Sequence, residues 1–193
     1  TAEKEPSLDY VVAKFPRFPF DKFNTVSNKL GTQMKATGEV MGIGTTLEEC
    51  FLKSIRSLEI GANHPQIAKF ENMDTEEMKE YVKDFSSDQV FAIFELLRRG
   101  VSVNELYKST MITELFLESF KKITDQEAVI KANKGDLKVL KDSKVMGFGD
   151  AYIAKVWEMD EKEVYKLRKD NAIVPVFKMV DTLHTGKYIA YLY

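Results

Sequence analysis

Two glycine-containing turns are the segments whose residue types could hold a phosphate group. Residues 42–46 (GIGTT) follow an extended run and precede a helical pattern, and residues 146–150 (MGFGD) precede another helical pattern. Backbone N–H groups at the start of a helix often bind phosphate. The first turn, however, lacks the third glycine of the dinucleotide fingerprint and the lysine of the P-loop. We therefore interpret both segments as tight turns that cap helices.

Histidine and cysteine give no clear catalytic or metal-binding pattern. The only histidines, His64 and His184, are far apart in the sequence, and neither belongs to a spaced group of ligands. The single cysteine, Cys50, adjoins the apolar stripe of a predicted helix, which favours a small core residue. A nucleophilic pairing of Cys50 with a histidine remains an alternative without a local signature to support it. The sequence thus predicts no catalytic residue, no cofactor-binding residue and no metal ligand.

Basic residues could form an anion site only if the fold brought them together. Six are candidates: Lys35, Arg56, Arg98, Arg99, Lys121 and Lys122. Nothing in their spacing shows convergence, so we interpret them as solvated surface. The chain has 28 Lys and Arg against 30 Asp and Glu, a net charge of -2. This balance predicts neither nucleic acid nor a membrane as a partner, because binding to phosphate backbones and anionic lipid needs clustered cations.

The composition is that of an ordinary globular protein. Of the 193 residues, 44% are hydrophobic and 30% are charged, as in globular proteins. A chain of this length with this hydrophobic content can bury a sizeable core. No run approaches the roughly 18 apolar residues of a membrane span, and one cysteine suits a reducing compartment, so we expect a soluble, cytoplasmic protein. The chain begins at Thr1 and stops within the strand-like run 188–193 (YIAYLY). We expect a piece of a longer polypeptide, because an apolar strand with an unprotected edge would pair with other chains.

The N-terminal part contains two short extended runs followed by a helix. Residues 9–15 are rich in β-branched and aromatic types, and Pro16 and Pro19 are expected to end this strand. A second run covers residues 39–43, and Thr46 is placed to cap a helix. The apolar stripe of that helix comprises Leu47, Phe51, Ile55 and Leu58.

The rest of the chain is predicted to be an array of short helices. A boundary is marked by Gly61, Asn63 and Pro65, and helical spacing follows. Helices are expected over about 75–85, 87–99, 102–107, 111–123, 125–132, 136–142, 149–157 and 160–169. Residues 173–180 and 188–193 look extended. The predicted fold class is mainly α: a small strand-strand-helix remnant over residues 1–62, followed by the helical array over residues 63–193.

Several segments, in order, resemble the middle of the large chain of carbamoyl-phosphate synthase. The run 33–44 (QMKATGEVMGIG) is similar to the family signature MKxxGEVMxIG. The other matching segments are 5–18 (EPSLDYVVAKFPRF), 98–105 (RRGVSVNE), 147–154 (GFGDAYIA), 166–168 (KLR) and 175–182 (PVFKMVDT). This resemblance implies that residues 1–62 are the C-terminal edge of the first ATP-grasp (carboxyphosphate) domain and that residues 63–193 are the helical oligomerisation domain.

The resemblance also implies a parent enzyme, a ligase that makes carbamoyl phosphate from bicarbonate, ATP and ammonia for arginine and pyrimidine synthesis. Glutamine supplies the ammonia through a glutaminase small chain, and the parent uses ATP with Mg or Mn. The family's phosphate loop and metal ligands precede the region that this chain resembles. We therefore expect an inactive segment without a cofactor, whose partners are the rest of the large chain and the small chain. The alternative is a stand-alone helical protein-binding module.

The chain departs from the family pattern at three positions. An arginine is usual at Thr45, and an aspartate and a tryptophan are usual at Thr113 and Leu115, so contacts made by those side chains are in doubt here. An oligomerisation domain also implies self-association, and we expect a weak homodimer. Phe91 and Leu117 are the residues predicted to fall outside the intramolecular stripes and to form the self-association surface.

Overall fold

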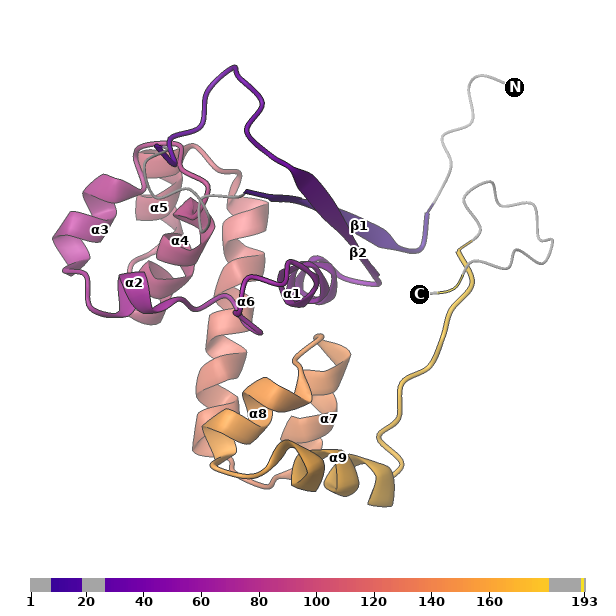
Figure 1. Cartoon of the computed structure of the whole chain (residues 1–193). Helices are drawn as coiled ribbons and strands as arrows, with labels where there is room; N and C mark the ends of the chain where they lie inside the picture. Colours follow the sequence, from indigo (N-terminus) through magenta and orange to yellow (C-terminus); the bar gives the residue numbers. More distant parts are fainter. Residues whose placement is uncertain (1–7, 19–26, 181–191, 193) are drawn as a thin grey trace.

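The computed structural model describes residues 8–18, 27–180 and 192. Within these residues a two-stranded antiparallel ribbon precedes nine helices (Figure 1). The predicted mainly α fold with a small strand remnant is therefore confirmed. None of the helices in the described part is both long and apolar enough to cross a membrane.

The ribbon consists of β1 (Val11–Arg17) and β2 (Gly38–Gly44), with Val11 opposite Gly44. Helix α1 (Leu47–Ser57) packs against both strands. The prediction that Pro16 ends the first strand is wrong, because β1 continues through it. A proline is tolerated there because each strand of a two-stranded ribbon is an edge strand, on which a missing N–H need not break the ladder.

The remaining helices surround the long helix α6, which runs down the middle of the molecule in Figure 1. Helices α4 and α5 contact α6 near one end, and α7 and α8 contact it near the other. The bounds are α2 (Ala68–Glu71), α3 (Thr75–Tyr81), α4 (Gln89–Arg98), α5 (Val103–Thr110), α6 (Glu114–Ala132), α7 (Leu137–Val145), α8 (Asp150–Trp157) and α9 (Glu161–Asp170).

Local capping residues behave largely as their types predict. The side chains of Thr46, Asp74 and Ser102 each accept a hydrogen bond from a backbone N–H in the first turn of their helix. Gly100 follows α4 with φ +86°, a conformation that glycine adopts without strain. The cap of α4 differs from the prediction, since the helix begins after Asp88 rather than at Ser86 or Ser87.

Two further predictions are wrong at the level of elements. The sequence predicts separate helices over 111–123 and 125–132, but α6 is continuous because Ile123, Glu127 and Ile130 keep one buried face across the expected break. Residues 173–180 contain no strand. Met179 forms only an isolated bridge with Leu192, and the other residues of the predicted run 188–193 lie outside the described part.

The core consists of two apolar clusters that meet around α6. One lies among α1 to α6 and contains Ile55, Phe70 and Leu96, and the other lies among α1, α4 and α6 to α9 and contains Phe148 and Trp157. Three half-buried side chains, Phe51, Val90 and Phe120, pack against both clusters. The ribbon, α1 and the helical array thus share one continuous core.

Candidate functional site

The glycine turn before α1 uses its polar donors within the chain. The Thr46 hydroxyl accepts from the Glu49 N–H at 3.2 Å, and the Glu49 carboxylate accepts from the Thr45 N–H at 2.8 Å and from its hydroxyl at 3.1 Å. Burial raises the pKa of Glu49, but hydrogen bonds from Lys53 and Thr45 outweigh it and hold this pKa below its usual value. The N–H and hydroxyl of Thr45 are therefore already used by a carboxylate of the chain, and the interpretation as a capped tight turn is confirmed.

The glycines of this turn allow α1 to lie close to β2. A β-carbon at Gly42 would overlap the carbonyl oxygen of Cys50 and the hydroxyl of Ser54, and one at Gly44 would overlap the Glu49 side chain. Helix backbone cannot move away from such an overlap without shifting α1 as a whole. Close packing against helix backbone therefore explains glycine at position 42, whereas at Gly44 the neighbour is the flexible Glu49 side chain.

Cys50 is a core residue, as its position beside the stripe predicted. Its side chain is fully buried, and Sγ donates to the Val11 carbonyl oxygen at 2.9 Å. Burial raises the pKa of the thiol to about 11, so it is uncharged at neutral pH. A neutral, enclosed thiol is not a nucleophile.

The second glycine turn attaches α8 to α1. Gly147 has φ +98°, and a β-carbon there would overlap the Glu49 backbone. Arg56 Nη1 donates to the Gly147 carbonyl oxygen at 2.5 Å, and Gly149 is the N-cap of α8. The predicted cap is therefore present, although no side chain completes it with a hydrogen bond.

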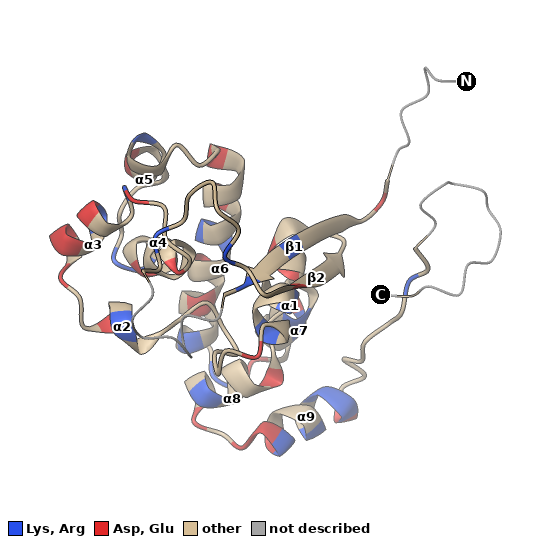
Figure 2. Cartoon of the chain, turned by 45° about the horizontal axis from the view of Figure 1, so that its top comes forward, with Lys and Arg blue, Asp and Glu red and all other residues tan. Residues whose placement is uncertain are grey.

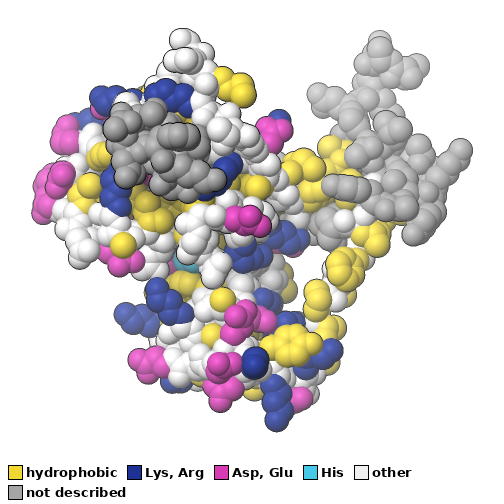
Figure 3. Space-filling view, in the orientation of Figure 1, with side chains coloured by type: hydrophobic (Ala, Val, Ile, Leu, Met, Phe, Trp, Pro, Cys, Tyr) yellow, Lys and Arg dark blue, Asp and Glu magenta, His cyan; other side chains and the backbone are white. Residues whose placement is uncertain are grey.

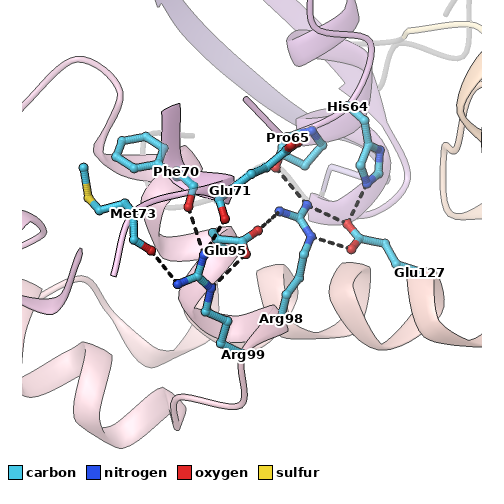
Figure 4. Close-up of polar contacts among 9 residues, drawn as sticks. All are labelled: His64, Pro65, Phe70, Glu71, Met73, Glu95, Arg98, Arg99 and Glu127. Atoms are coloured by element: carbon cyan, nitrogen blue, oxygen red, sulfur yellow. Dashed lines mark hydrogen bonds and ion pairs between the residues drawn. The ribbon is translucent and has the colours of Figure 1, made fainter. Parts of the chain in front are cut away.

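A buried polar cluster of His64, Arg98 and Glu127 joins α4 and α6 to the connector that follows α1 (Figure 4). Arg98 Nε donates to Glu127 Oε2 at 2.7 Å and Nη2 donates to Oε1 at 2.9 Å, while His64 Nε2 lies 2.6 Å from Oε1. Arg98 Nη2 also donates to the Pro65 carbonyl oxygen at 2.8 Å. The cluster ties three segments together, and sequence periodicity did not reveal it. The only signal was an acidic residue at a stripe position of α6.

The charge states in this cluster follow from its burial. Burial raises the pKa of Glu127, but hydrogen bonds from Arg98 and His64 outweigh it and keep this pKa below its usual value. Burial lowers the pKa of His64, and the hydrogen bond to Glu127 does not reverse the shift. We assign a neutral imidazole that donates from Nε2, because Arg98 already neutralises Glu127. The His64 ring also stacks on Tyr152, with ring centres 3.7 Å apart.

The six basic residues considered from the sequence do not gather into one site. Arg99, the neighbour of Arg98 on α4, points away from Glu127 and donates to Glu95 and to the carbonyls of Phe70, Glu71 and Met73 (Figure 4). The other four are dispersed: Lys35 donates to backbone carbonyls, Arg56 to Gly147, Lys121 to Asp125, and Lys122 pairs with Glu48. Figure 2 accordingly shows acidic and basic positions interspersed over the helices.

Metal binding finds no support in the part of the chain that the structure describes. No group of three or more His, Cys, Asp or Glu residues there could hold a metal ion. His64 contacts a single carboxylate, Glu127, through Nε2, and His184 lies outside the described residues.

The residues predicted to form the self-association surface lie in the core of a single copy. Phe91 and Leu117 are both buried and belong to the first apolar cluster. The expectation that they fall outside the intramolecular stripes is therefore wrong. The reason is that α4 is covered on several sides at once and that Leu117 faces inward from α6, so neither side chain is free to meet a second copy.

Other apolar side chains are exposed. Met111, Leu115 and Phe116, which we call the α5–α6 patch, are 71%, 58% and 44% exposed. Leu115 and Thr113 are the two positions in this region where a departure from the family pattern was expected, and Thr113, the N-cap of α6, makes no capping hydrogen bond. A second line of apolar side chains follows α9 along the extended segment, where Val176 and Phe177 are 85% and 76% exposed (Figure 3).

Comparison with known protein families shows which family the greater part of the chain matches. Residues 39–172, which run from β2 to just beyond α9, match the family described as the oligomerisation domain of the carbamoyl-phosphate synthetase large chain. The match therefore covers 134 of the 193 residues, from 172 minus 39 plus 1. It includes α1 and every residue of the buried polar cluster.

Proposed function

Because the chain belongs to the family of the carbamoyl-phosphate synthetase large-chain oligomerisation domain, we propose that it connects the two ATP-grasp halves of such a large chain and supports self-association. The enzyme would make carbamoyl phosphate from bicarbonate, ATP and glutamine-derived ammonia, for arginine and pyrimidine synthesis in the cytoplasm. Its other partner would be the glutaminase small chain. In this proposal residues 1–62 close the first ATP-grasp domain and residues 63–193 form the connector.

The observation that carries the connecting role is the way Phe51 joins the ribbon to the helices. The Phe51 ring centre lies 5.6 Å from that of Phe15 in β1, 5.4 Å from Phe94 in α4 and 4.8 Å from Phe120 in α6. Interlocked aromatic side chains resist bending, because protein interiors are close-packed. A rigid joint suits an enzyme whose unstable intermediates must pass between sites, where small misplacements of reacting groups are costly.

The exposed side of the ribbon is an argument for a neighbouring domain that covers it. A two-stranded ribbon is marginally stable on its own and has open edges. Val12 and Met41 are exposed on the strands, whereas Phe15 and Val40 pack on the core. We propose that the preceding part of the ATP-grasp domain covers the exposed side and that the second half of the large chain covers the segment around Phe177.

We propose that two copies of the chain associate through the α5–α6 patch. Its three side chains lie together in sequence and remain uncovered in one copy, as a two-fold contact requires. The patch is much smaller than the roughly 800 Å² per partner of a stable interface. We therefore propose a weak, concentration-dependent homodimer.

Sedimentation velocity over a concentration series tests this dimer. Leu115→Glu should keep the chain monomeric, whereas Val129→Glu, which places the same charge on an exposed position of the same helix, should leave the dimer intact. A wild-type chain that stays monomeric at several hundred micromolar, or equal effects of the two variants, would reject the patch as the contact.

Phe51→Ala in the whole large chain tests the connecting role. We expect bicarbonate-dependent ATP hydrolysis to persist while the carbamoyl phosphate formed per ATP falls. Phe85→Ala removes an equally large but exposed ring and should leave the yield unchanged. Loss of both activities together, or of neither, contradicts the proposal.

The transcript that encodes this segment gives a second test. A transcript with no ATP-grasp sequence on either side of the segment would contradict the proposal and favour the stand-alone binding module.

The chain alone is proposed to be inactive and to need no cofactor, while the parent uses ATP with Mg or Mn. Phosphate binding needs several backbone N–H groups and a nearby cation, and the donors of Thr45 already serve Glu49. Titration calorimetry with ATP and Mg²⁺ should show no saturable binding at micromolar concentration. Saturable heat in that range would contradict this part of the proposal.

A further inference from the structure

A polar cavity of about 370 Å³ lies where α1, the connector after it, α7, α8 and α9 meet. Its lining residues are Arg56, Asn63, Lys144, Gly149, Asp150, Ala151 and Glu161. Volumes of this size are typical of pockets for small molecules. The cavity is distinct from the ribbon, the Phe51 joint and the α5–α6 patch, so a ligand site there does not depend on the proposed connecting role.

Two cations line this cavity, Arg56 and Lys144, and a third, Arg168, lies outside the lining but bonds to the lining carboxylate Asp150. Lys144 Nζ lies 2.8 Å from Asp150 Oδ1, and Arg168 donates to Asp150 Oδ2 from Nη2 at 2.8 Å and from Nε at 3.0 Å. Both oxygens of Asp150 are therefore occupied by these two cations. Among the described residues no carboxylate forms an ion pair with Arg56.

Arg56 has N–H groups at the cavity wall that are available to a ligand. Its Nη1 donates to the Gly147 carbonyl oxygen, and no acceptor in the described part of the chain takes a hydrogen bond from its Nε or Nη2. Lys144 uses two of its three N–H groups, on Phe148 and Asp150. Guanidinium and ammonium donors that face one cavity match the tetrahedral oxygens of a phosphate group.

We propose that this cavity is a binding site for a phosphate group, held by Arg56 and Lys144. The amide of Asn63 and the backbone of Ala151 at the start of α8 lie beside it as secondary donors. The cavity is open to solvent, so an organic group attached to the phosphate can extend out of it, and we take a small phosphate monoester as the ligand class.

The electrostatics agree with an anionic ligand. Burial lowers the pKa of Arg56, and neither Asp150 nor Glu49 restores it. Burial likewise lowers the pKa of Lys144, and its hydrogen bond to Asp150 does not reverse the shift. With Arg168 beside the lining, three cations stand here against the two carboxylates of Asp150 and Glu161. The exposed Glu161 at the rim opposes an anion and reduces its affinity.

Nuclear magnetic resonance titration of the chain tests the proposal. Glucose 6-phosphate and inorganic phosphate are added separately, with chloride at matched ionic strength as the reference. We expect saturable shifts of the Gly149 and Ala151 amides with both phosphates, at lower concentration for the ester. Equal affinity would reject the ester as the ligand class and leave a site for free phosphate. Equal shifts with chloride, or none, would overturn the site.

Variants separate specific contact from general charge. Arg56→Met should weaken phosphate binding about tenfold, because it removes charge-assisted hydrogen bonds. Lys162→Met removes the same charge from α9 outside the cavity lining and should leave the affinity unchanged. Because Arg56 also holds Gly147, Glu161→Gln is the safer second variant, and it should tighten binding about twofold. Unchanged affinity in a folded Arg56→Met or in Glu161→Gln would overturn the proposal.

Discussion

Replacement of Glu127 by glutamine should destabilise the chain strongly, because this carboxylate neutralises a largely buried arginine. Glu127 is 8% exposed and accepts from Arg98 at 2.7 and 2.9 Å. Removing one partner of a buried ion pair costs about 3–5 kcal/mol. Arg98 keeps a weaker contact of 3.3 Å to Glu95 and some solvent exposure. We therefore expect the lower end of that range, about 3 kcal/mol.

Urea denaturation at pH 7.5 measures this loss of unfolding free energy. The control is Asp125→Asn, which removes an exposed ion pair with Lys121 on the same helix and should cost about 0–0.5 kcal/mol. The dependence of unfolding free energy on urea should be unchanged in both variants. A loss below about 1 kcal/mol for Glu127→Gln, or one equal to the control, would refute the view that Arg98 depends on this carboxylate.

The same cluster predicts that stability falls as the pH is lowered. The pKa of His64 is lower in the folded chain than its usual 6.5, so the unfolded chain binds a proton first and stability declines below about pH 6.5. The pKa of Glu127 is likewise lowered from 4.5, so its contribution is complete above that pH and is lost as the pH falls further. Urea midpoints between pH 7.5 and 3.5 check both steps. A midpoint that rises on acidification through pH 6 would mean that His64 is charged.

Three further outcomes are expected. Gly42→Ala should cost about 1–3 kcal/mol of unfolding free energy because its β-carbon overlaps α1, whereas Gly38→Ala, with open space around it, should cost little; urea unfolding compares them. Thr113→Asp should stabilise α6 by about 0.5–1 kcal/mol, seen as a higher melting temperature, because the threonine makes no capping hydrogen bond and a negative charge favours a helix start. Cys50 should react with a thiol reagent at pH 7.5 only at the rate of chain opening, and fast labelling of the folded chain would contradict its burial.

Much of the local structure was predictable because it depends on residues within four positions of one another. Thr46, Asp74 and Ser102 cap helices through bonds to the next two or three residues. The stripe containing Phe51 and Ile55 indicated which face of α1 is buried. The family resemblance also lay in short runs such as 33–44, part of which the family match covers.

The tertiary structure alone decided which apolar faces stay exposed. Phe91 and Leu117 were predicted to form the self-association surface because their positions were expected to fall outside the intramolecular stripes. Spacing alone could not settle this, since a stripe that faces its own core has the same spacing as one that faces a second copy. Contacts from other helices bury both, while Leu115 and Phe116, which precede Leu117 in the sequence, remain exposed. Element ends were also uncertain, as the uninterrupted α6 shows, since long-range packing can carry a helix past a polar stretch.

Pairings between distant residues were the part of the site that the sequence could not supply. His64 and Arg98 reach Glu127 across 63 and 29 positions, and Arg56 reaches Gly147 across 91. Residue type indicates that a charge needs a partner, but not which one, because the choice depends on how all the helices pack at once. The sequence therefore determined most of the helices, several of their caps and the family resemblance, whereas only the packed chain determined the continuity of α6, the buried polar cluster and the cavity beside Arg56.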